Sequence, residues 1–241
     1  MQFFKSILFV IFLNLWGMII PIIYFPSIIF QNSKLADHGA KIWSIVGLWV
    51  LKKLCKIDYQ ILGEQYIPRA PAIIACKHQS AWETIVMHMI LHRPVYAYKK
   101  ELRKIPFYGW FLYAMSGIAV DRKGGASALK EVIRQAKKFI AKKQIVVIFP
   151  QGTRVKVGGN LQEFPYQSGI VALYMACDVD VVPVALNSGI FWPKYQILKK
   201  PGTIKIEFLE PIKTGLSKKE FLEKLQNDIE EKTAILEKNI S

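Results

Sequence analysis

The chain has 241 residues, of which 52% are hydrophobic and 21% charged, so it can build a packed core and is not a disordered protein. Its formal net charge is +15 at pH 7, and the excess lies between residues 34 and 216. Such a surface attracts nucleic acid, anionic lipid head groups or phosphorylated substrates, and charge alone does not choose among them. Three scattered cysteines, Cys55, Cys76 and Cys177, exclude a disulfide framework and a zinc site, so we expect no metal and a reducing compartment.

The N-terminal segment is almost wholly apolar. Residues 6–33 carry no charge, and the apolar run over residues 7–30 is long enough for one tilted membrane span. Pro21 and Pro26 interrupt this run, and a proline inside a helix kinks or ends it, so a hairpin of short helices buried in one leaflet competes with a span. A cleaved signal peptide is a third interpretation, disfavoured because no small-residue cleavage site follows closely.

A second apolar stretch, residues 42–51, is too short to span a bilayer. Its tryptophans, Trp43 and Trp49, and its flanking lysines suit a helix at the membrane interface, with a buried core helix as the alternative. By the positive-inside rule, the lysines of residues 34–56 predict that the following body faces the cytoplasm.

Beyond residue 55, short β-rich runs alternate with amphipathic segments. Apolar residues at helical spacing predict helices over residues 127–143 and 221–236. The runs that read as strands are 58–62, 72–76, 95–98, 118–120, 145–149, 179–184 and 203–208. Strands alternating with helices predict a single α/β domain with a mixed sheet, mostly buried between flanking helices.

The first motif, K-H-Q-S-A-W-E-T at residues 77–84, follows a buried strand and opens a helix. With His78 in the turn before that helix, Glu83 in the first turns can reach the imidazole ring. A carboxylate on one ring nitrogen leaves the other nitrogen free to accept a proton. This segment alone also fits a structural histidine, and Cys76 fits either a reactive thiol paired with His78 or a core cysteine.

Two further motifs end in charged residues. The second, residues 116–122, is a short strand ending in Asp121 and Arg122. In the third, F-P-Q-G-T-R at residues 149–154, Gly152 lets backbone approach a ligand, Thr153 supplies a hydroxyl, and Arg154 can hold a phosphate with two hydrogen bonds. The Walker spacing is absent, and each motif alone is also explained by an ordinary turn.

Together and in this order, H-Q-S-x-x-E, G-x-x-x-D-R, F-P-x-G-T-R and V-P-V-A (residues 182–185) resemble the four-block pattern of the glycerolipid acyltransferase family. The resemblance is closest to bacterial 1-acylglycerol-3-phosphate acyltransferases, and K-K-E-L at 99–102 with P-F-Y-G at 106–109 supports it. It covers residues 40–215. It implies acyl transfer from acyl-CoA or acyl carrier protein to the free hydroxyl of 1-acylglycerol 3-phosphate, giving phosphatidic acid in phospholipid biosynthesis, without a cofactor.

The resemblance also implies roles for residues and segments. His78 would take the proton of the acceptor hydroxyl, and Glu83 would orient its ring. From the apolar run, the lysines and the change of pattern after residue 55, we expect residues 1–55 to form membrane-associated helices and residues 56–241 the acyltransferase catalytic domain, at the inner (cytoplasmic) membrane and facing the cytoplasm. The substrate-binding residues, chiefly for the acceptor phosphate, would be Arg122, Gly152, Thr153, Arg154 and Lys100.

Two positions depart from the family pattern. Glu83 stands where the first block has Asp, and Gln151 stands where the third block has Glu and so lacks its charge. The competing functions are an acyltransferase for another lysolipid or amino-lipid, and a non-catalytic basic membrane adaptor, which leaves the motifs unexplained. Membrane lipids are the expected partners, and the basic face of helix 127–143 suits an acidic donor. No nucleic-acid-binding module pattern appears, so we expect no nucleic acid partner.

Overall fold

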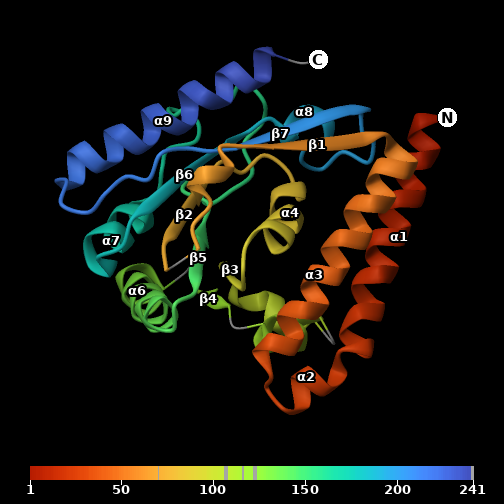
Figure 1. Cartoon of the computed structure of the whole chain (residues 1–241), viewed down its shortest axis with the longest axis horizontal. Coiled ribbons are helices and arrows are strands. Elements are labelled where there is room, and N and C mark those ends of the chain that lie inside the picture. Colours follow the sequence, from red (N-terminus) through yellow and green to blue (C-terminus); the bar gives the residue numbers. More distant parts are fainter. Residues whose placement is uncertain (70, 106–107, 116, 122–123, 240–241) are drawn as a thin grey trace.

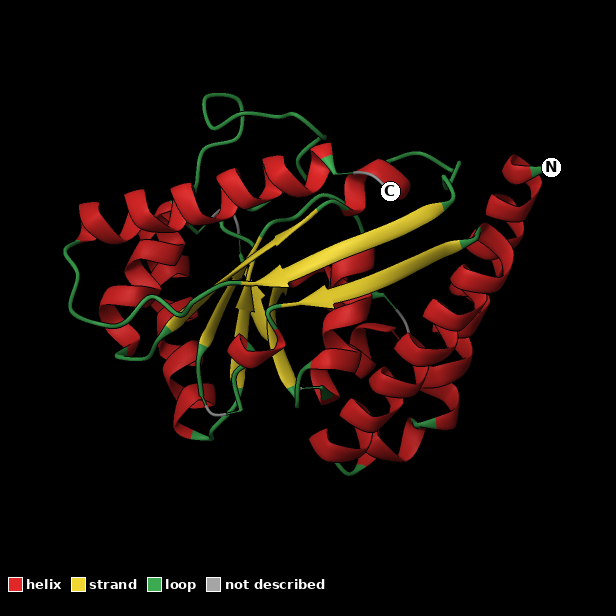
Figure 2. Cartoon of the chain, turned by 45° about the horizontal axis from the view of Figure 1, so that its top comes forward, coloured by secondary structure: helices red, strands yellow, loops and turns green. Residues whose placement is uncertain are grey.

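The structure is a computed structural model that describes residues 1–241 except 70, 106–107, 116, 122–123 and 240–241. The described residues form a seven-stranded sheet with helices on both faces and a helical hairpin along one side (Figures 1 and 2). Every predicted strand is confirmed, to within two residues at each end. The strands are β1 (Ile57–Leu62), β2 (Ile73–Cys76), β3 (Pro94–Lys99), β4 (Ile118–Val120), β5 (Ile145–Ile148), β6 (Val181–Leu186) and β7 (Gly202–Phe208).

The order of strands decides which segments meet at one edge of the sheet. The order is β1-β7-β6-β2-β5-β3-β4, and all neighbours are parallel except β6 and β7, so the expected mixed sheet is confirmed. Because β2 is parallel to both β5 and β6, the carboxyl ends of these three strands lie at the same edge. Residues 77–84 and 149–154, which follow β2 and β5, are therefore brought together.

The two faces of the sheet have separate cores. Ile73 and Ala75 of β2 pack with α6 (Gly125–Ala141), α7 (Ser168–Cys177) and α9 (Lys218–Lys238). Ile74 and Cys76, on the opposite face, pack with α4 (Trp82–Ile90) and the N-terminal helices. Cys76 is fully buried, and burial raises the pKa of its thiol well above the usual range, so the core-cysteine interpretation is the correct one. The helices predicted over 127–143 and 221–236 are confirmed as α6 and α9.

The N-terminal hairpin consists of α1 (Gln2–Ile23), α2 (Phe25–Ile29) and α3 (Ser33–Val50), and a π-helix (Leu51–Cys55) leads from it into β1. The prolines mark the bend, because α1 ends two residues after Pro21 and Pro26 lies in the first turn of α2. By length and composition, α1 is long and apolar enough to cross a membrane. A Cβ atom on Gly39 of α3 would lie 2.8 Å from the ring of Tyr24, so glycine permits the close packing here.

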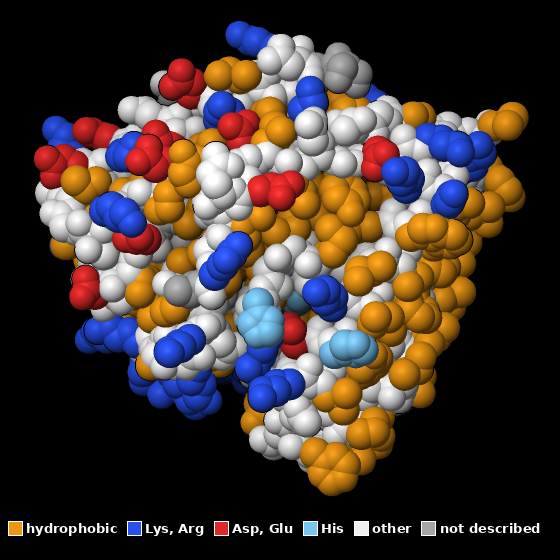
Figure 3. Space-filling view, viewed as in Figure 1, with side chains coloured by type: hydrophobic (Ala, Val, Ile, Leu, Met, Phe, Trp, Pro, Cys, Tyr) orange, Lys and Arg blue, Asp and Glu red, His pale blue; other side chains and the backbone are white. Residues whose placement is uncertain are grey.

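The stretch at residues 42–51 is partly buried in the core and partly exposed at the surface. It is the second half of α3 and the start of the π-helix, with Leu48 buried in the core and Trp49 exposed. Hydrophobic side chains gather on the surface over the hairpin (Figure 3). The short helix α5 (Tyr108–Ala114) packs against all three hairpin helices, so the hairpin and the sheet enclose a space between them.

Candidate active site

His78 and Glu83 are paired as predicted. Glu83 is fully buried in the first turn of α4, and one of its carboxylate oxygens lies 2.8 Å from Nδ1 of His78. Nδ1 therefore carries the proton that it donates to the carboxylate, which leaves Nε2 as the basic nitrogen. The His78 side chain is partly exposed and stacks on the Phe149 ring, with the ring centroids 4.0 Å apart.

The Glu83 carboxylate accepts more than the histidine proton. The backbone N–H groups of Gln79 and Ser80 donate to the same oxygen at 2.6 and 2.7 Å. The hydroxyl of Ser188, at the start of α8 (Ser188–Phe191), donates to the other oxygen at 2.8 Å. These bonds fix the carboxylate in the turn that carries His78, so the longer side chain at this position still reaches the ring.

The turn after β5 lies against the turn after β2. The backbone N–H of Val155 donates to the carbonyl of His78 at 2.7 Å, and Gly152 has a φ of 66°, in the left-handed region that favours glycine. Gln151 is buried, and its side-chain amide donates to the carbonyl of Phe164 at 3.1 Å. A glutamate has no hydrogen to donate when ionised, so the departure at position 151 fits a structural bond in this chain.

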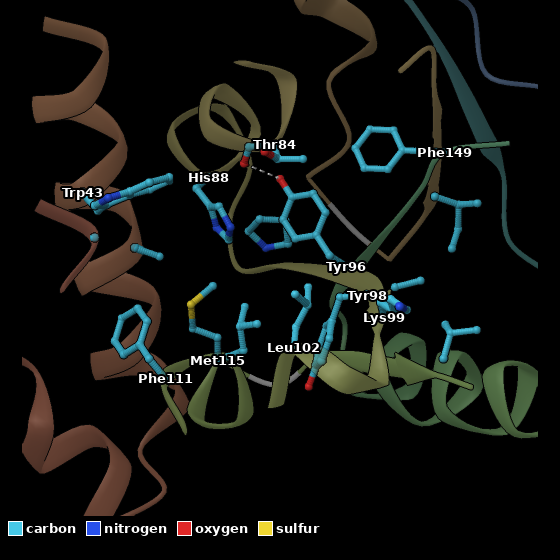
Figure 4. Close-up of a pocket in the computed structure, with 18 of the residues that line it drawn as sticks. Trp43, Thr84, His88, Tyr96, Tyr98, Lys99, Leu102, Phe111, Met115 and Phe149 are labelled. Atoms are coloured by element: carbon cyan, nitrogen blue, oxygen red, sulfur yellow. Dashed lines mark hydrogen bonds between the residues drawn. The ribbon is translucent and has the colours of Figure 1, made fainter. Parts of the chain in front are cut away.

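An apolar cavity of about 510 Å³ opens beside His78 (Figure 4). Figure 4 shows Trp43 of α3 and Phe111 of α5 on one side, Phe149 on the other, and Tyr96 of β3 between them. The cavity thus joins the histidine to the N-terminal hairpin. Besides those four, the lining includes Gly17 and Ile20 of α1, Leu102, Met115, Gly152 and Arg154.

Only some of the predicted substrate-binding residues line the cavity. Gly152 and Arg154 line the cavity with His78, and Thr153 lies between them in the chain. Lys99 lines the cavity, whereas its neighbour Lys100 is exposed and lies 3.8 Å from the carboxylate of Asp121. Arg122 lies outside the described residues, as do Pro106, Phe107 and Ser116 of the motifs.

Sequence reasoning missed two groups at this site. Ser188 follows the V-P-V-A block, and nothing in the sequence around it indicates a bond to Glu83. Lys194, in the loop after α8, donates from Nζ to the Thr153 hydroxyl at 3.1 Å. Across the described residues there is no group of three or more His, Cys, Asp or Glu side chains that is suited to a metal ion.

The chain is similar to known proteins of one family. A family model described as "Acyltransferase" matches residues 58–187, more than half of the chain. The 1-acyl-sn-glycerol-3-phosphate acyltransferase of Pseudomonas aeruginosa is 36% identical over 164 residues, which are 68% of this chain and 63% of that protein. The enzyme of the same name from Saccharomyces cerevisiae is 27% identical over 187 residues, 75% of this chain and 61% of that protein. The chain thus spans somewhat over three fifths of these relatives.

Among solved structures, the 1-acyl-sn-glycerophosphate (LPA) acyltransferase PlsC from Thermotoga maritima has the same fold. The TM-score is 0.81, and the match covers 100% of both chains at 20% sequence identity. The likeness confirms the predicted α/β fold with its N-terminal helices.

His88 of α4 is a buried histidine on the cavity wall. Its ring lies 4.9 Å from that of Tyr96, and its Nδ1 has no hydrogen-bond partner within the described part of the chain. Burial lowers the pKa of His88 to about 4, because the charged ring loses its hydration there. The folded protein therefore holds this ring neutral at pH values where an unfolded chain protonates it.

We predict that His88→Phe reduces the acid sensitivity of folding. Between pH about 6.5 and pH 4 the unfolded state binds a proton at His88 that the folded state does not, so stability falls as the pH falls. The variant lacks this contribution and should lose about 3 kcal/mol less over that range. Thermal unfolding of the full chain in detergent at pH 7 and pH 4.5 measures it, with the exposed His92→Phe as control. Equal pH dependence in His88→Phe and wild type would contradict the prediction.

Proposed function

This chain belongs to the acyltransferase family, and from that membership we propose that it transfers an acyl chain from a thioester to the free hydroxyl of 1-acylglycerol 3-phosphate, forming phosphatidic acid. The observation that carries the proposal is the meeting of three features at one sheet edge. These are the His78–Glu83 pair, an apolar cavity of about 510 Å³, and the cationic turn at Gly152–Arg154. The pair would supply the base, the cavity would hold a fatty chain, and the turn would bind the acceptor phosphate.

In the proposed reaction, Nε2 of His78 takes the proton of the acceptor hydroxyl while that oxygen attacks the thioester carbonyl. A carbon–oxygen bond forms, the carbon–sulfur bond breaks, and the proton passes from the imidazolium to the departing sulfur. Glu83 holds the ring in the tautomer that leaves Nε2 basic and stabilises the imidazolium. No acyl-enzyme is needed, and the buried Cys76 takes no part.

The cavity is proposed to hold an acyl chain. Its wall is mainly aromatic and aliphatic, and it runs from His78 to α1 and α3 (Figure 4). The free energy of moving a fatty chain from water into such a cavity is favourable by about 0.8 kcal/mol for each buried methylene group. Chain binding in this position would place the reacting carbonyl near His78, at the open end of the cavity.

The acceptor phosphate is proposed to bind at the turn after β5. Arg154 makes no ion pair with any carboxylate of the described residues, so its guanidinium is available to a phosphate. Gly152 lines the cavity beside Arg154, and Thr153 adds a hydroxyl. Lys100 and Arg122 remain predicted to bind the same substrate.

Membrane attachment is proposed for the hairpin. The outward face of α1 carries a row of exposed apolar side chains. The acyl tail of the acceptor stays in the bilayer, so the active site must lie at the level of the lipid head groups to reach it. We place the body on the cytoplasmic side of the inner membrane. The donor is acyl-CoA or acyl carrier protein, and the lysines of α6 suit either, because both are acidic.

The base is tested by substitution. His78→Ala should lower turnover by about two to four orders of magnitude, and Glu83→Gln by about two, because an amide cannot accept all of the bonds made to the carboxylate. The assay is acyl transfer to 1-acylglycerol 3-phosphate by the full chain in mixed micelles, with each donor. Glu163→Gln, on the surface, is the control. Full activity of His78→Ala would refute the mechanism, and an inactive wild type with both donors would refute the function.

The phosphate site is tested at Arg154. Arg154→Lys should raise the KM for 1-acylglycerol 3-phosphate about tenfold and leave kcat within about twofold, because lysine cannot reproduce the two-pronged contact. The KM for the donor should not change. An acceptor KM equal to that of the wild type would argue against this placement of the phosphate.

The attachment is tested on the exposed face of α1. Ile11 and Leu15 are 51% and 53% exposed, and the double change Ile11→Glu with Leu15→Glu would carry two charges into the bilayer. We expect most of the protein to stop floating with vesicles that contain anionic phospholipid. Ile235→Glu, on α9 and 42% exposed in the wild type, should float normally. Equal flotation of all three proteins would show that α1 does not insert.

A further inference from the structure

The loop between α8 and β7 (residues 192–201) brings a lysine to the turn after β5. Nζ of Lys194 donates to the hydroxyl of Thr153 at 3.1 Å and to the carbonyl of Arg154 at 3.2 Å. Lys194 lies in none of the motifs, and it is separated from that turn by forty residues of chain. An ammonium group has three donor hydrogens, and these two bonds leave one hydrogen to point elsewhere.

Lys194 brings a second positive charge to the turn that carries Arg154. The ring of Tyr195 is a shared neighbour, with its centroid 4.8 Å from Nζ of Lys194 and 6.0 Å from the guanidinium carbon of Arg154. No carboxylate in the described ranges lies within ion-pair distance of either cation. Two cations near one turn, neither paired with a carboxylate, suit an anionic ligand that carries more than one charge.

The loop is braced in a way that holds Lys194 in place. The buried ammonium of Lys199 donates to the carbonyls of Gln196 and Ile197, each at 2.8 Å. Its backbone N–H donates to the hydroxyl of Ser6 in α1 at 2.9 Å, which ties the loop to the hairpin. Tyr195 has a φ of 61°, a left-handed conformation that costs energy for a residue with a side chain and turns the chain directly after Lys194. A preorganised loop loses little entropy when a ligand binds.

We propose that Lys194 is a further cation of the acceptor site, beside Arg154, and selects a phosphate monoester over a phosphate diester. The proposal rests on the proposed function. A monoester carries about −1.5 to −2 charges at pH 7, whereas a diester carries one. An added cation favours the more highly charged phosphate, so Lys194 beside Arg154 favours the monoester over the diester. Lys194 is thus a specificity-determining residue for 1-acylglycerol 3-phosphate against lysophospholipids whose phosphate bears a second alcohol.

The kinetic test compares Lys194→Met with Lys200→Met, which removes an exposed lysine from the same loop. Lys194→Met should raise the KM for 1-acylglycerol 3-phosphate about tenfold, with kcat and the donor KM within about twofold. Its relative activity on lysophosphatidylglycerol, a diester, should rise by a similar factor, and Lys194→Arg should restore the preference. A similar change in Lys200→Met, or an equal loss on monoester and diester, would overturn the proposal.

A binding test separates this inference from the proposed function. The inactive His78→Ala chain, in detergent, is titrated with 1-acylglycerol 3-phosphate, with and without the added Lys194→Met change. We expect about tenfold weaker binding in the double variant, with an unchanged thermal midpoint. Equal binding by the two proteins overturns the role of Lys194 alone. No binding by the His78→Ala parent overturns the proposed function and this inference with it.

Discussion

The hydrogen bonds that end on the buried carboxylate of Glu83 set the geometry of the whole site. A carboxylate removed from water is costly unless its oxygens accept bonds, and here they accept from His78, from two backbone N–H groups and from Ser188. The same bonds join the end of β2, the start of α4 and the start of α8. The ring of His78 can therefore not turn without leaving a buried charge short of a partner, and it stays on the wall of the cavity.

Helix α9 also fixes the turn that carries His78. Nζ of the buried Lys77 lies 2.5 Å from a carboxylate oxygen of Glu230, and the Gln79 amide donates to Glu237 at 2.6 Å. These two residues flank His78, so its backbone is fixed on both sides by one helix from the far end of the chain. The bond from Val155 to the His78 carbonyl adds a third fixed point. Such support would keep His78 within the small positional tolerance that its proposed role as general base requires.

The N-terminal hairpin contributes to the core and to the cavity, as the sheet does. Phe9 of α1 and Leu48 of α3 lie in the same hydrophobic cluster as Trp82 of α4 and Ile74 of β2. The cavity is walled by both parts, so the segment that we propose to enter the bilayer also shapes the space for the acyl chain. In the proposed function, a fatty chain would reach His78 through this space between the hairpin and the sheet.

The sequence by itself determined the local elements and the chemistry of the motifs. Short β-rich runs marked the strands, the prolines marked the bend of the hairpin, and the spacing of His78 and Glu83 predicted their contact, because each signal acts over a few residues. It gave no sign of α7, which is apolar on all sides and so lacks a helical period. Only the tertiary structure decided the strand order, the cavity, and the places of Ser188 and Lys194. Those contacts join segments far apart in the chain, and their partners are chosen by how the sheet and helices pack, which no local pattern encodes.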